Sequence, residues 1–352
     1  MVQTPEEIKE IGLVYVTDSM PGIYRKGKPG NFHYEDKNGQ EITDEKQLDR
    51  IKKLVLPPAW TNVWIASKKN AYLQATGLDV AGRKQYRYHA DWTSRRSDHK
   101  YFRLLDFGKA LPQARKRIAK DLKRKEFDEQ KVLAICVQVM QKTLIRVGNE
   151  SYAQLYGSYG LSTLRTKHAK VDGNTLKLKF VGKKGVKQEV ALNDKSLSKM
   201  VKRVMEIPGQ DLFQYYTDGK EHKAIDSGKI NNYIREITGS DFTAKDFRTW
   251  GGTLEALRQL SICTSNVEEP EKPKKKIIVQ VLDCVASKLG NTRAVCKSSY
   301  VYPLLLEAFE KDSLGKYLQK IHKEKPESLQ AIENDEKVLM KFLKAAQKDL
   351  QK

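Results

Sequence analysis

The chain has 352 residues with 65 lysines and arginines against 44 aspartates and glutamates, a formal net charge of +21, and 39% of its residues are hydrophobic. This balance permits folded cores, the length predicts about two domains, and the charge predicts a polyanionic partner, with a solvated basic surface of no consequence as the alternative. No stretch of about 18 apolar residues occurs and the start lacks the order of a signal peptide, so neither a transmembrane helix nor secretion is expected.

Short strands are predicted between residues 12 and 89. Five segments there are rich in β-branched and aromatic residues: 13–16, 23–25, 32–34, 63–66 and 85–88. Proline–glycine at 29–30 and asparagine–glycine at 38–39 supply tight turns, the second being a strong hairpin signal. Residues 43–54 predict a capped helix, which the following prolines end. Residues 1–91 are therefore predicted to form a small β-rich N-terminal domain.

The rest of the chain has mainly helical spacing. Apolar residues in 132–144 recur at the period of a helix and form a stripe along one side. Residues 175–181 alternate with period two instead, and with 186–190 they predict a β-hairpin whose tip carries Lys183. The second domain, 92–352, is therefore predicted to be mainly α with one β-hairpin, and the fold class of the chain is α+β.

Three charged segments of this second domain have no assigned chemistry. Residues 268–276 contain two prolines and several charges, which predicts a mobile connection. The tail from residue 333 predicts a lysine-rich helix with apolar residues along it. Residues 115–125 carry seven cations and one aspartate, which fits contact with a polyanion backbone and a solvated helix face equally well.

Candidate chemistry lies in four segments that are far apart in the sequence. Tyr300 lies in one of them, and Arg146, Lys183 and Arg248 each lie in a glycine-containing segment upstream. A tyrosine attacks a nucleic-acid phosphate only if fixed cations neutralise the charge that grows on the non-bridging oxygens, and two arginines plus a lysine meet that need. Each cation alone is more often a surface ion pair or a solvated side chain, whereas their joint occurrence favours a phosphodiester-cleaving site.

These segments resemble the type IB DNA topoisomerases of the compact bacterial and poxviral kind. The family pattern has an arginine in Arg-x-Gly, a lysine in Phe-Val-Gly-Lys, an arginine in Lys-Asp-Phe-Arg-Thr-Trp-Gly, a His or Asn, and a nucleophilic tyrosine. The similarity covers most of the chain, from about 82 to 303 together with the strand-rich start. The matching residues are Arg146, Lys183, Arg248, Asn291 and Tyr300.

The resemblance implies a DNA topoisomerase that works by transesterification. Tyr300 would attack a DNA phosphate, form a 3′-phosphotyrosyl bond and release a 5′-hydroxyl end. Supercoils of either sign would relax before that hydroxyl reseals the strand, and neither ATP, a metal nor another cofactor is needed. The fold implied is a monomer whose two domains close around duplex DNA as a C-shaped clamp.

Physical chemistry assigns roles to the cations. Arg146 and Arg248 suit the stabilisation of phenolate and of the phosphorane oxygens, because a guanidinium stays charged and binds in bidentate fashion. Lys183 suits the protonation of the leaving 5′-oxygen, with the adjacent Lys184 as the competitor for that role. Asn291 is expected to donate a hydrogen bond to a phosphate oxygen, because an amide does not exchange protons near neutral pH.

The resemblance also implies DNA contacts outside these residues. Family positions that match Gln85, Tyr86 and Tyr88 contact DNA from the N-terminal domain, and Tyr152 matches a phosphate-contacting position. On a strand the two tyrosines at 86 and 88 would share one face, opposite Gln85 and Arg87. An ordinary half-buried strand with both tyrosines in the core is the alternative, and Tyr152 equally fits a core position.

Two other functions remain open at this point. Tyrosine recombinases share the Arg, Lys, Arg and Tyr chemistry but usually have histidine where this chain has Lys245, and the strand-rich start also argues against them. A non-catalytic basic DNA-binding protein would explain the charge alone. The four cysteines lie far apart without a CxxC pair, so we expect reduced thiols, no metal site and a cytoplasmic protein. The resemblance to DNA topoisomerases implies that it associates with the nucleoid.

Overall fold

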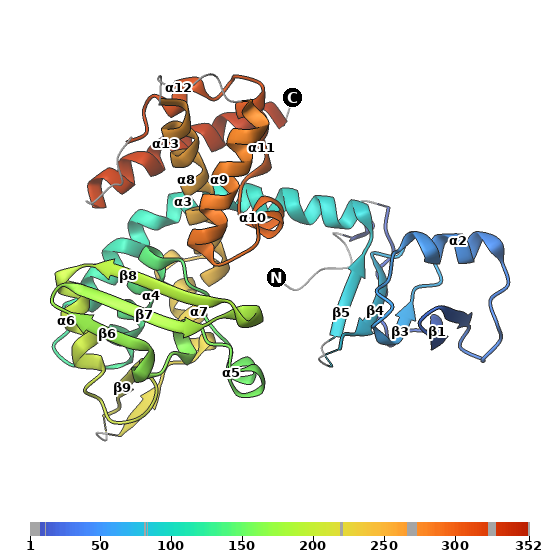
Figure 1. Cartoon of the computed structure of the whole chain (residues 1–352), viewed down its shortest axis with the longest axis horizontal. Coiled ribbons are helices and arrows are strands. Elements are labelled where there is room, and N and C mark those ends of the chain that lie inside the picture. Colours follow the sequence, from blue (N-terminus) through green and yellow to red (C-terminus); the bar gives the residue numbers. More distant parts are fainter. Residues whose placement is uncertain are drawn as a thin grey trace. The chain divides into compact units, whose positions relative to one another are not determined.

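The computed structural model describes residues 8–10, 12–80, 82, 84–218, 221–265, 273–322 and 329–350 (Figure 1). It divides into two compact units, Met1–Tyr101 and Phe102–Lys352. The first unit contains a β-sheet and the second is mostly helical, so the predicted α+β class is confirmed. Helix α3 (Ala90–Leu122) continues through residue 91, where the sequence predicted a domain boundary, and that boundary stays a prediction.

The first unit is built on a five-stranded antiparallel sheet in the order β2-β1-β3-β4-β5. Its strands are β1 (Ile23–Lys28), β2 (Asn31–Glu35), β3 (Thr61–Ile65), β4 (Leu73–Leu78) and β5 (Lys84–Tyr88). The prediction of a strand at 13–16 is wrong, because within that segment only Val14 forms a β-bridge, with Ala71. The sequence missed β4, because Leu-Gln-Ala-Thr-Gly-Leu lacks a run of β-branched residues.

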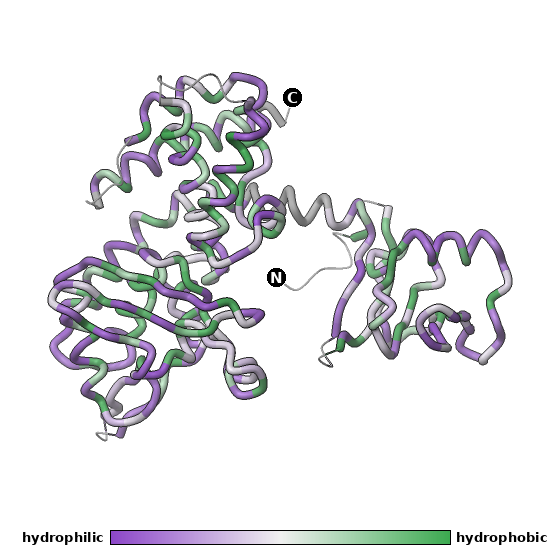
Figure 2. Tube along the Cα trace, in the orientation of Figure 1, coloured by the Kyte–Doolittle hydropathy of each residue, from purple (hydrophilic) through white to green (hydrophobic). Residues whose placement is uncertain are grey.

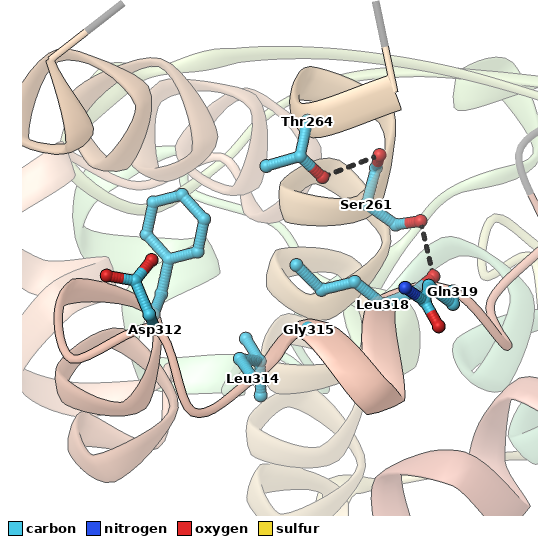
Figure 3. Close-up of a pocket in the computed structure, with 8 residues that line it drawn as sticks. Ser261, Thr264, Asp312, Leu314, Gly315, Leu318 and Gln319 are labelled. Atoms are coloured by element: carbon cyan, nitrogen blue, oxygen red, sulfur yellow. Dashed lines mark hydrogen bonds between the residues drawn. The ribbon is translucent and has the colours of Figure 1, made fainter.

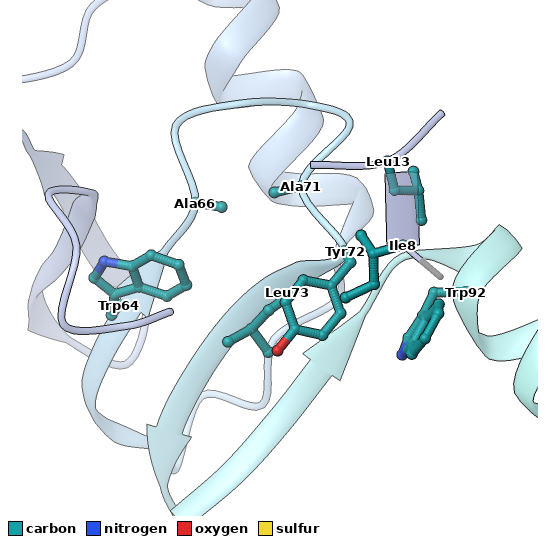
Figure 4. Close-up of a cluster of buried hydrophobic side chains, with 8 residues drawn as sticks. All are labelled: Ile8, Leu13, Trp64, Ala66, Ala71, Tyr72, Leu73 and Trp92. Carbon is teal, nitrogen blue, oxygen red and sulfur yellow. The ribbon is translucent and has the colours of Figure 1, made fainter. Parts of the chain in front are cut away.

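Both faces of this sheet are covered by apolar side chains. Helix α2 (Glu45–Lys53) begins after Asp44, whose side chain accepts a hydrogen bond from Gln47 N at 3.1 Å, as the sequence predicted. Its Ile51 packs on one face of the sheet, beside Val63 and Ile65. Neighbouring strand residues point to opposite faces, so Trp64 joins a cluster on the other face. That cluster contains Ile8, Leu13, Trp64, Ala66, Ala71, Tyr72, Leu73 and Trp92 (Figure 4).

Helices form most of the second unit. After α3 they are α4 (Glu129–Thr143), α5 (Glu150–Tyr156), α6 (Lys195–Val204), α7 (Ser227–Thr238), α8 (Ala244–Ser265), α9 (Lys274–Leu289), α10 (Arg293–Ser299), α11 (Pro303–Glu310), α12 (Gly315–Leu318) and α13 (Leu329–Leu350). Helix α4 has the predicted apolar stripe and is buried over most of its length. It contacts α6, α7 and α8, so it forms the centre of this unit.

The predicted β-hairpin is present in the second unit. Strands β7 (Thr175–Val181) and β8 (Lys187–Asn193) pair antiparallel, and β6 (Ala169–Asp172) adds a third strand. Alternate residues of β7 are buried, which matches the period-two pattern of hydropathy along these strands (Figure 2). A short 3-10 turn, Lys183–Gly185, forms the tip. The sequence missed the small pair β9 (Gln214–Tyr216) and β10 (His222–Ala224).

In the basic segment 115–125, the arginines and the lysines have different surroundings. Arg115 donates to both carboxylate oxygens of Glu336 on α13, at 2.7 and 2.9 Å, and Arg117 and Arg124 also pair with carboxylates. The three arginines therefore make ion pairs within the chain, and contact of this segment with a polyanion stays a prediction. The lysines of this segment are all exposed: Lys116, Lys120, Lys123 and Lys125.

Three further features concern the ends and connections of the second unit. The predicted tail helix is present as α13, which buries Leu339 and Leu343. Most of the predicted mobile connection at 268–276 lies outside the described residues, and α9 starts at Lys274. Among the helices of the described ranges, none combines the length and apolar character that crossing a membrane requires.

Candidate active site

Arg248 is the most deeply buried of the predicted site residues. It lies on α8 with 3% of its surface exposed. Its Nη2 donates to Leu289 O at 3.0 Å and its Nη1 donates to Leu144 O. Leu144 follows the last turn of α4 and Leu289 ends α9, so one guanidinium binds carbonyls that helix ends leave without an intrahelical partner. The arginine is thus held by backbone from two other helices.

The phenol ring of Tyr300 lies against this arginine. Arg248 Cζ is 4.9 Å from the centroid of the ring. Tyr300 follows the last residue of α10, and its backbone N donates to Cys296 O at 3.0 Å. The short helix therefore ends at the tyrosine and presents its half-buried side chain to the buried cation.

Arg146 reaches the same region from the segment after α4. Its two Nη atoms each donate to Gly290 O at 3.2 Å, and Nη2 also donates to Asn291 Oδ1. Gly290 ends α9 in the left-handed conformation, with φ of 58°. The side-chain oxygen of Asn291 therefore already accepts a hydrogen bond from Arg146. The donor of the same amide, Nδ2, is buried and makes no hydrogen bond to an oxygen or nitrogen atom of the described residues, but the amide interacts with the Cys296 thiol.

Helix α8 also holds the backbone at Tyr300. Thr253 Oγ1 donates to Tyr300 O at 3.1 Å and accepts from Tyr302 N at 3.2 Å. A Cβ on Gly252 would lie 2.9 Å from Tyr300 O, so only glycine permits this approach. Sequence reasoning missed both residues. The signal was present, because a glycine pair inside a helical segment often marks close packing.

The charges around Tyr300 change its acidity. Burial by itself raises the pKa of the phenol, but the positive charge and hydrogen bond of Arg248, then the charges of Arg146 and Lys245, outweigh it. The net result is a Tyr300 pKa below its ordinary value of 10.0. Phenolate, the nucleophilic form of tyrosine, therefore forms more readily at this position than in a free tyrosine.

Lys183 has a different setting from the two arginines. It is exposed at the tip of the β7–β8 hairpin, where Lys184 has a φ of 63°. The hairpin is tied to the segment after α5 by Tyr159 N, which donates to Val181 O at 2.7 Å. That segment in turn binds the backbone of Arg146, since Leu161 N donates to Arg146 O at 2.8 Å. The structure thus gathers Arg146, Arg248, Asn291 and Tyr300, and leaves Lys183 at an exposed tip.

The predicted DNA-contacting residues of the first unit lie on β5. Gln85 Nε2 donates to Asp79 Oδ2 at 2.9 Å. Tyr86 and Tyr88 stack with centroids 6.1 Å apart, so they share one face as predicted. Tyr86 is 49% exposed, whereas Tyr88 is half-buried against the cluster around Tyr72. Their contact with DNA stays a prediction.

Tyr152, the predicted phosphate-contacting residue of the second unit, lies on α5. Asn149 caps this helix by accepting from Tyr152 N at 3.3 Å. The side chain of Tyr152 is 40% exposed, and its ring centroid is 5.9 Å from that of Tyr156. It is therefore not a core residue, and its role in binding stays a prediction.

A cavity elsewhere in the second unit contains none of these residues. It has a volume of about 400 Å³ and lies between α8, α11 and α12 (Figure 3). Ser261 in its wall already donates to Leu318 O at 2.8 Å. In the described part of the chain, no group of three or more His, Cys, Asp or Glu side chains is placed to hold a metal ion.

Comparisons with known proteins agree on one family. Residues 89–338 match the family model described as the catalytic core of eukaryotic DNA topoisomerase I, and residues 31–79 match that of the bacterial DNA topoisomerase IB N-terminal domain. The chain is 35% identical over 339 residues to DNA topoisomerase 1B of Acanthamoeba polyphaga mimivirus, covering 94% of this chain and 97% of that protein. It is 24% identical over 239 residues to DNA topoisomerase 1B of Vaccinia virus (strain Copenhagen), covering 66% and 70%.

Proposed function

The chain belongs to the type IB DNA topoisomerases, and from this premise we propose that it relaxes positive and negative supercoils through a 3′-phosphotyrosyl intermediate at Tyr300. One strand of the duplex is cleaved and later resealed. The reaction needs neither ATP nor a metal, because the energy of the phosphodiester is kept in the link to the enzyme. The enzyme works as a monomer in the cytoplasm, where it associates with the nucleoid.

The observation that carries this proposal is the convergence of separate segments on one phenol. Arg146 comes from the segment after α4, Arg248 from α8, and Asn291 from the turn between α9 and α10. The ring of Tyr300 lies 4.9 Å from Arg248 Cζ, and its pKa is lowered although burial opposes this. Such an arrangement suits a nucleophile more than a structural tyrosine, which burial alone would make less acidic.

The chemistry is a reversible exchange of two phosphoesters. The phenolate oxygen of Tyr300 attacks phosphorus, a P–O bond to tyrosine forms, and the P–O5′ bond breaks. Arg146 and Arg248 neutralise the charge that grows on the non-bridging oxygens. Lys183 gives a proton to the leaving 5′-oxygen, and resealing runs through the same steps in reverse.

Two hydrogen-bond donors in the site are available to a phosphate. Arg248 Nε and Asn291 Nδ2 are buried and make no hydrogen bond to an oxygen or nitrogen atom of the described residues, although the Asn291 amide interacts with the Cys296 thiol. A buried donor left unpaired costs about 1–3 kcal/mol, so an incoming phosphate oxygen that accepts from either donor would gain that energy. This supports the role predicted for Asn291, which is donation to the phosphate and not proton transfer.

DNA is held from both units in this proposal. The first unit contributes Gln85, Tyr86 and Tyr88 on β5, and the second contributes Tyr152 on α5. The two units close around duplex DNA as a C-shaped clamp. The exposed Lys183 enters the site when DNA is bound, because a hairpin tip moves more easily than a helix.

The proposal is tested by covalent trapping. A duplex whose scissile strand carries a 5′ label and a nick downstream is mixed with protein in EDTA and denatured. We expect label on the wild-type protein and on a Tyr317→Phe control, none on Tyr300→Phe, and relaxation of supercoiled plasmid in the same buffer. Normal relaxation by Tyr300→Phe, or label on another residue, would overturn the proposal. Recombinant products between two duplexes would instead indicate strand exchange.

A further inference from the structure

We propose that Gln188 on β8 is a positioning residue, which docks the hairpin that carries Lys183 onto the turn that holds Arg146 and Asn291. This inference rests on the proposed role of Lys183 as the proton donor. It adds a residue that the sequence did not single out and that acts through the placement of Lys183.

The side chain of Gln188 spans two glycines. On one side, a Cβ at Gly182 would lie 3.1 Å from Gln188 Cγ, so the stem of the glutamine packs on the residue before Lys183. On the other side, a Cβ at Gly290 would lie 2.4 Å from Oε1 and 2.5 Å from Nε2 of the same glutamine. The amide group therefore covers the α-carbon of Gly290. The left-handed φ of 58° favours glycine at this position, and a Cβ there would push the Gln188 amide away.

Gly290 is the point where the hairpin meets the catalytic arginine. Its carbonyl oxygen accepts from both Nη atoms of Arg146 at 3.2 Å, while its α-carbon is covered by Gln188. The next residue, Asn291, accepts from Arg146 through its side chain. A shift of the hairpin relative to Gly290 therefore changes the distance between Lys183 and the remaining site residues.

Besides Gln188, the tip is restrained by the bond from Tyr159 N to Val181 O at 2.7 Å and by two bonds within the turn. Gly182 N donates to Val186 O at 2.8 Å and Gly185 N donates to Gly182 O at 3.1 Å, and both bonds lie within the turn. These bonds shape the turn but do not place it against α9. Lys183 itself is exposed. Gln188 is half-buried and lies opposite Phe180 in the strand pair. Its contact with Gly290 places the turn against the end of α9.

The chemistry of the leaving group separates positioning of Lys183 from a general structural effect. If a sulfur atom replaces the bridging 5′-oxygen, the leaving group is a thiol with a pKa of about 8.5, and it departs without a proton donor. A variant that is slow only because Lys183 is misplaced therefore recovers on the sulfur substrate. A variant with a damaged site stays slow on both substrates.

The test compares Gln188→Ala with Glu189→Ala, the next residue on the strand, which faces the other way and pairs with the exposed Lys179 at 2.7 Å. Single-turnover cleavage is measured on oxygen and sulfur duplexes. We expect Gln188→Ala to be about tenfold slower on the oxygen duplex, near wild type on the sulfur duplex, and unchanged in DNA affinity. Glu189→Ala keeps both rates, and Gln188→Met, which preserves side-chain length, recovers most of the loss.

Two outcomes would overturn the inference: a wild-type rate for Gln188→Ala on the oxygen duplex, or equal slowing on both duplexes. Thermal melting of each variant accompanies the rates, and Gln188→Met provides a second reading if the alanine variant is poorly folded. Failure of the proposed function looks different, because wild-type protein would then form no covalent adduct with either duplex.

Discussion

The two ends of the site are built in opposite ways. Arg248 is buried and bound to carbonyls of two helix ends, whereas Lys183 is exposed on a short turn between two strands. The difference matches the two kinds of work in the proposed reaction. Charge stabilisation is strongest when the cation is already in place before the reaction, because no reorganisation is then needed. A proton donor must instead approach a leaving group that is present only when DNA is bound.

Helix ends explain how a buried arginine is tolerated in this protein. A guanidinium without partners in the interior is costly, but the last carbonyls of a helix lack intrahelical partners and carry partial negative charge. Leu144 O and Leu289 O are such groups. Removal of Arg248 would leave both carbonyls without this partner, so the arginine stabilises the fold in addition to its proposed role in the chemistry.

The largest expected effect is that of Arg248→Ala. Cleavage should fall by about 10²–10³-fold, as when an oxyanion donor is removed elsewhere. Stability should fall too, by about 1–3 kcal/mol for each carbonyl left unpaired. Single-turnover cleavage measures the first effect and denaturant unfolding measures the second. An Arg248→Ala variant with the unfolding free energy of the wild type would contradict a structural role for this arginine.

Lys183→Ala should lose activity without losing stability. We expect cleavage to fall by about 10²-fold, within the range for a general acid, and the melting temperature to stay unchanged because the side chain is exposed. Lys184→Ala is the matched control on the same turn and should keep its rate. If Lys184→Ala is the slow variant, the role belongs to Lys184.

A smaller effect is expected at Asn291. Asn291→Ala removes a donor to the phosphate and should slow cleavage by about tenfold, the rate equivalent of about 1.4 kcal/mol. Asn291→His keeps a ring N–H donor and should retain most of the activity. Cleavage assays at saturating protein measure both. Equal rates for Asn291→Ala and wild type would remove the residue from the site.

The smallest expected effect concerns pH. Lys245 lowers the pKa of Tyr300, after the larger influence of the two arginines, so Lys245→Ala should raise that pKa. In the proposed reaction phenolate is the reacting form, so the rising limb of the cleavage rate against pH should move to higher pH. Arg146→Ala should move it further in the same direction. A movement to lower pH in either variant would contradict the charge argument.

Local pattern in the sequence was enough for several elements. The period-two alternation of 175–181 predicted β7, and Asp44 before a helical segment predicted the cap of α2. Such signals depend on neighbours within a few residues, so they survive without knowledge of the fold. The strand β4 had no such signal, because its burial comes from the strands beside it. The same holds for Arg115, whose partner Glu336 is 221 residues away.

The residue types of the candidate site were determined by the sequence, since a tyrosine, two arginines, a lysine and an amide could be named from short motifs. Only the tertiary structure decided how they are held. It placed Arg146 on a carbonyl 144 residues away, paired Thr253 with the backbone at Tyr300, and set Gln188 against Gly290. The physical reason is that a short motif identifies a chemical group from neighbouring residues. The position of that group in space depends on how helix ends from distant parts of the chain pack together.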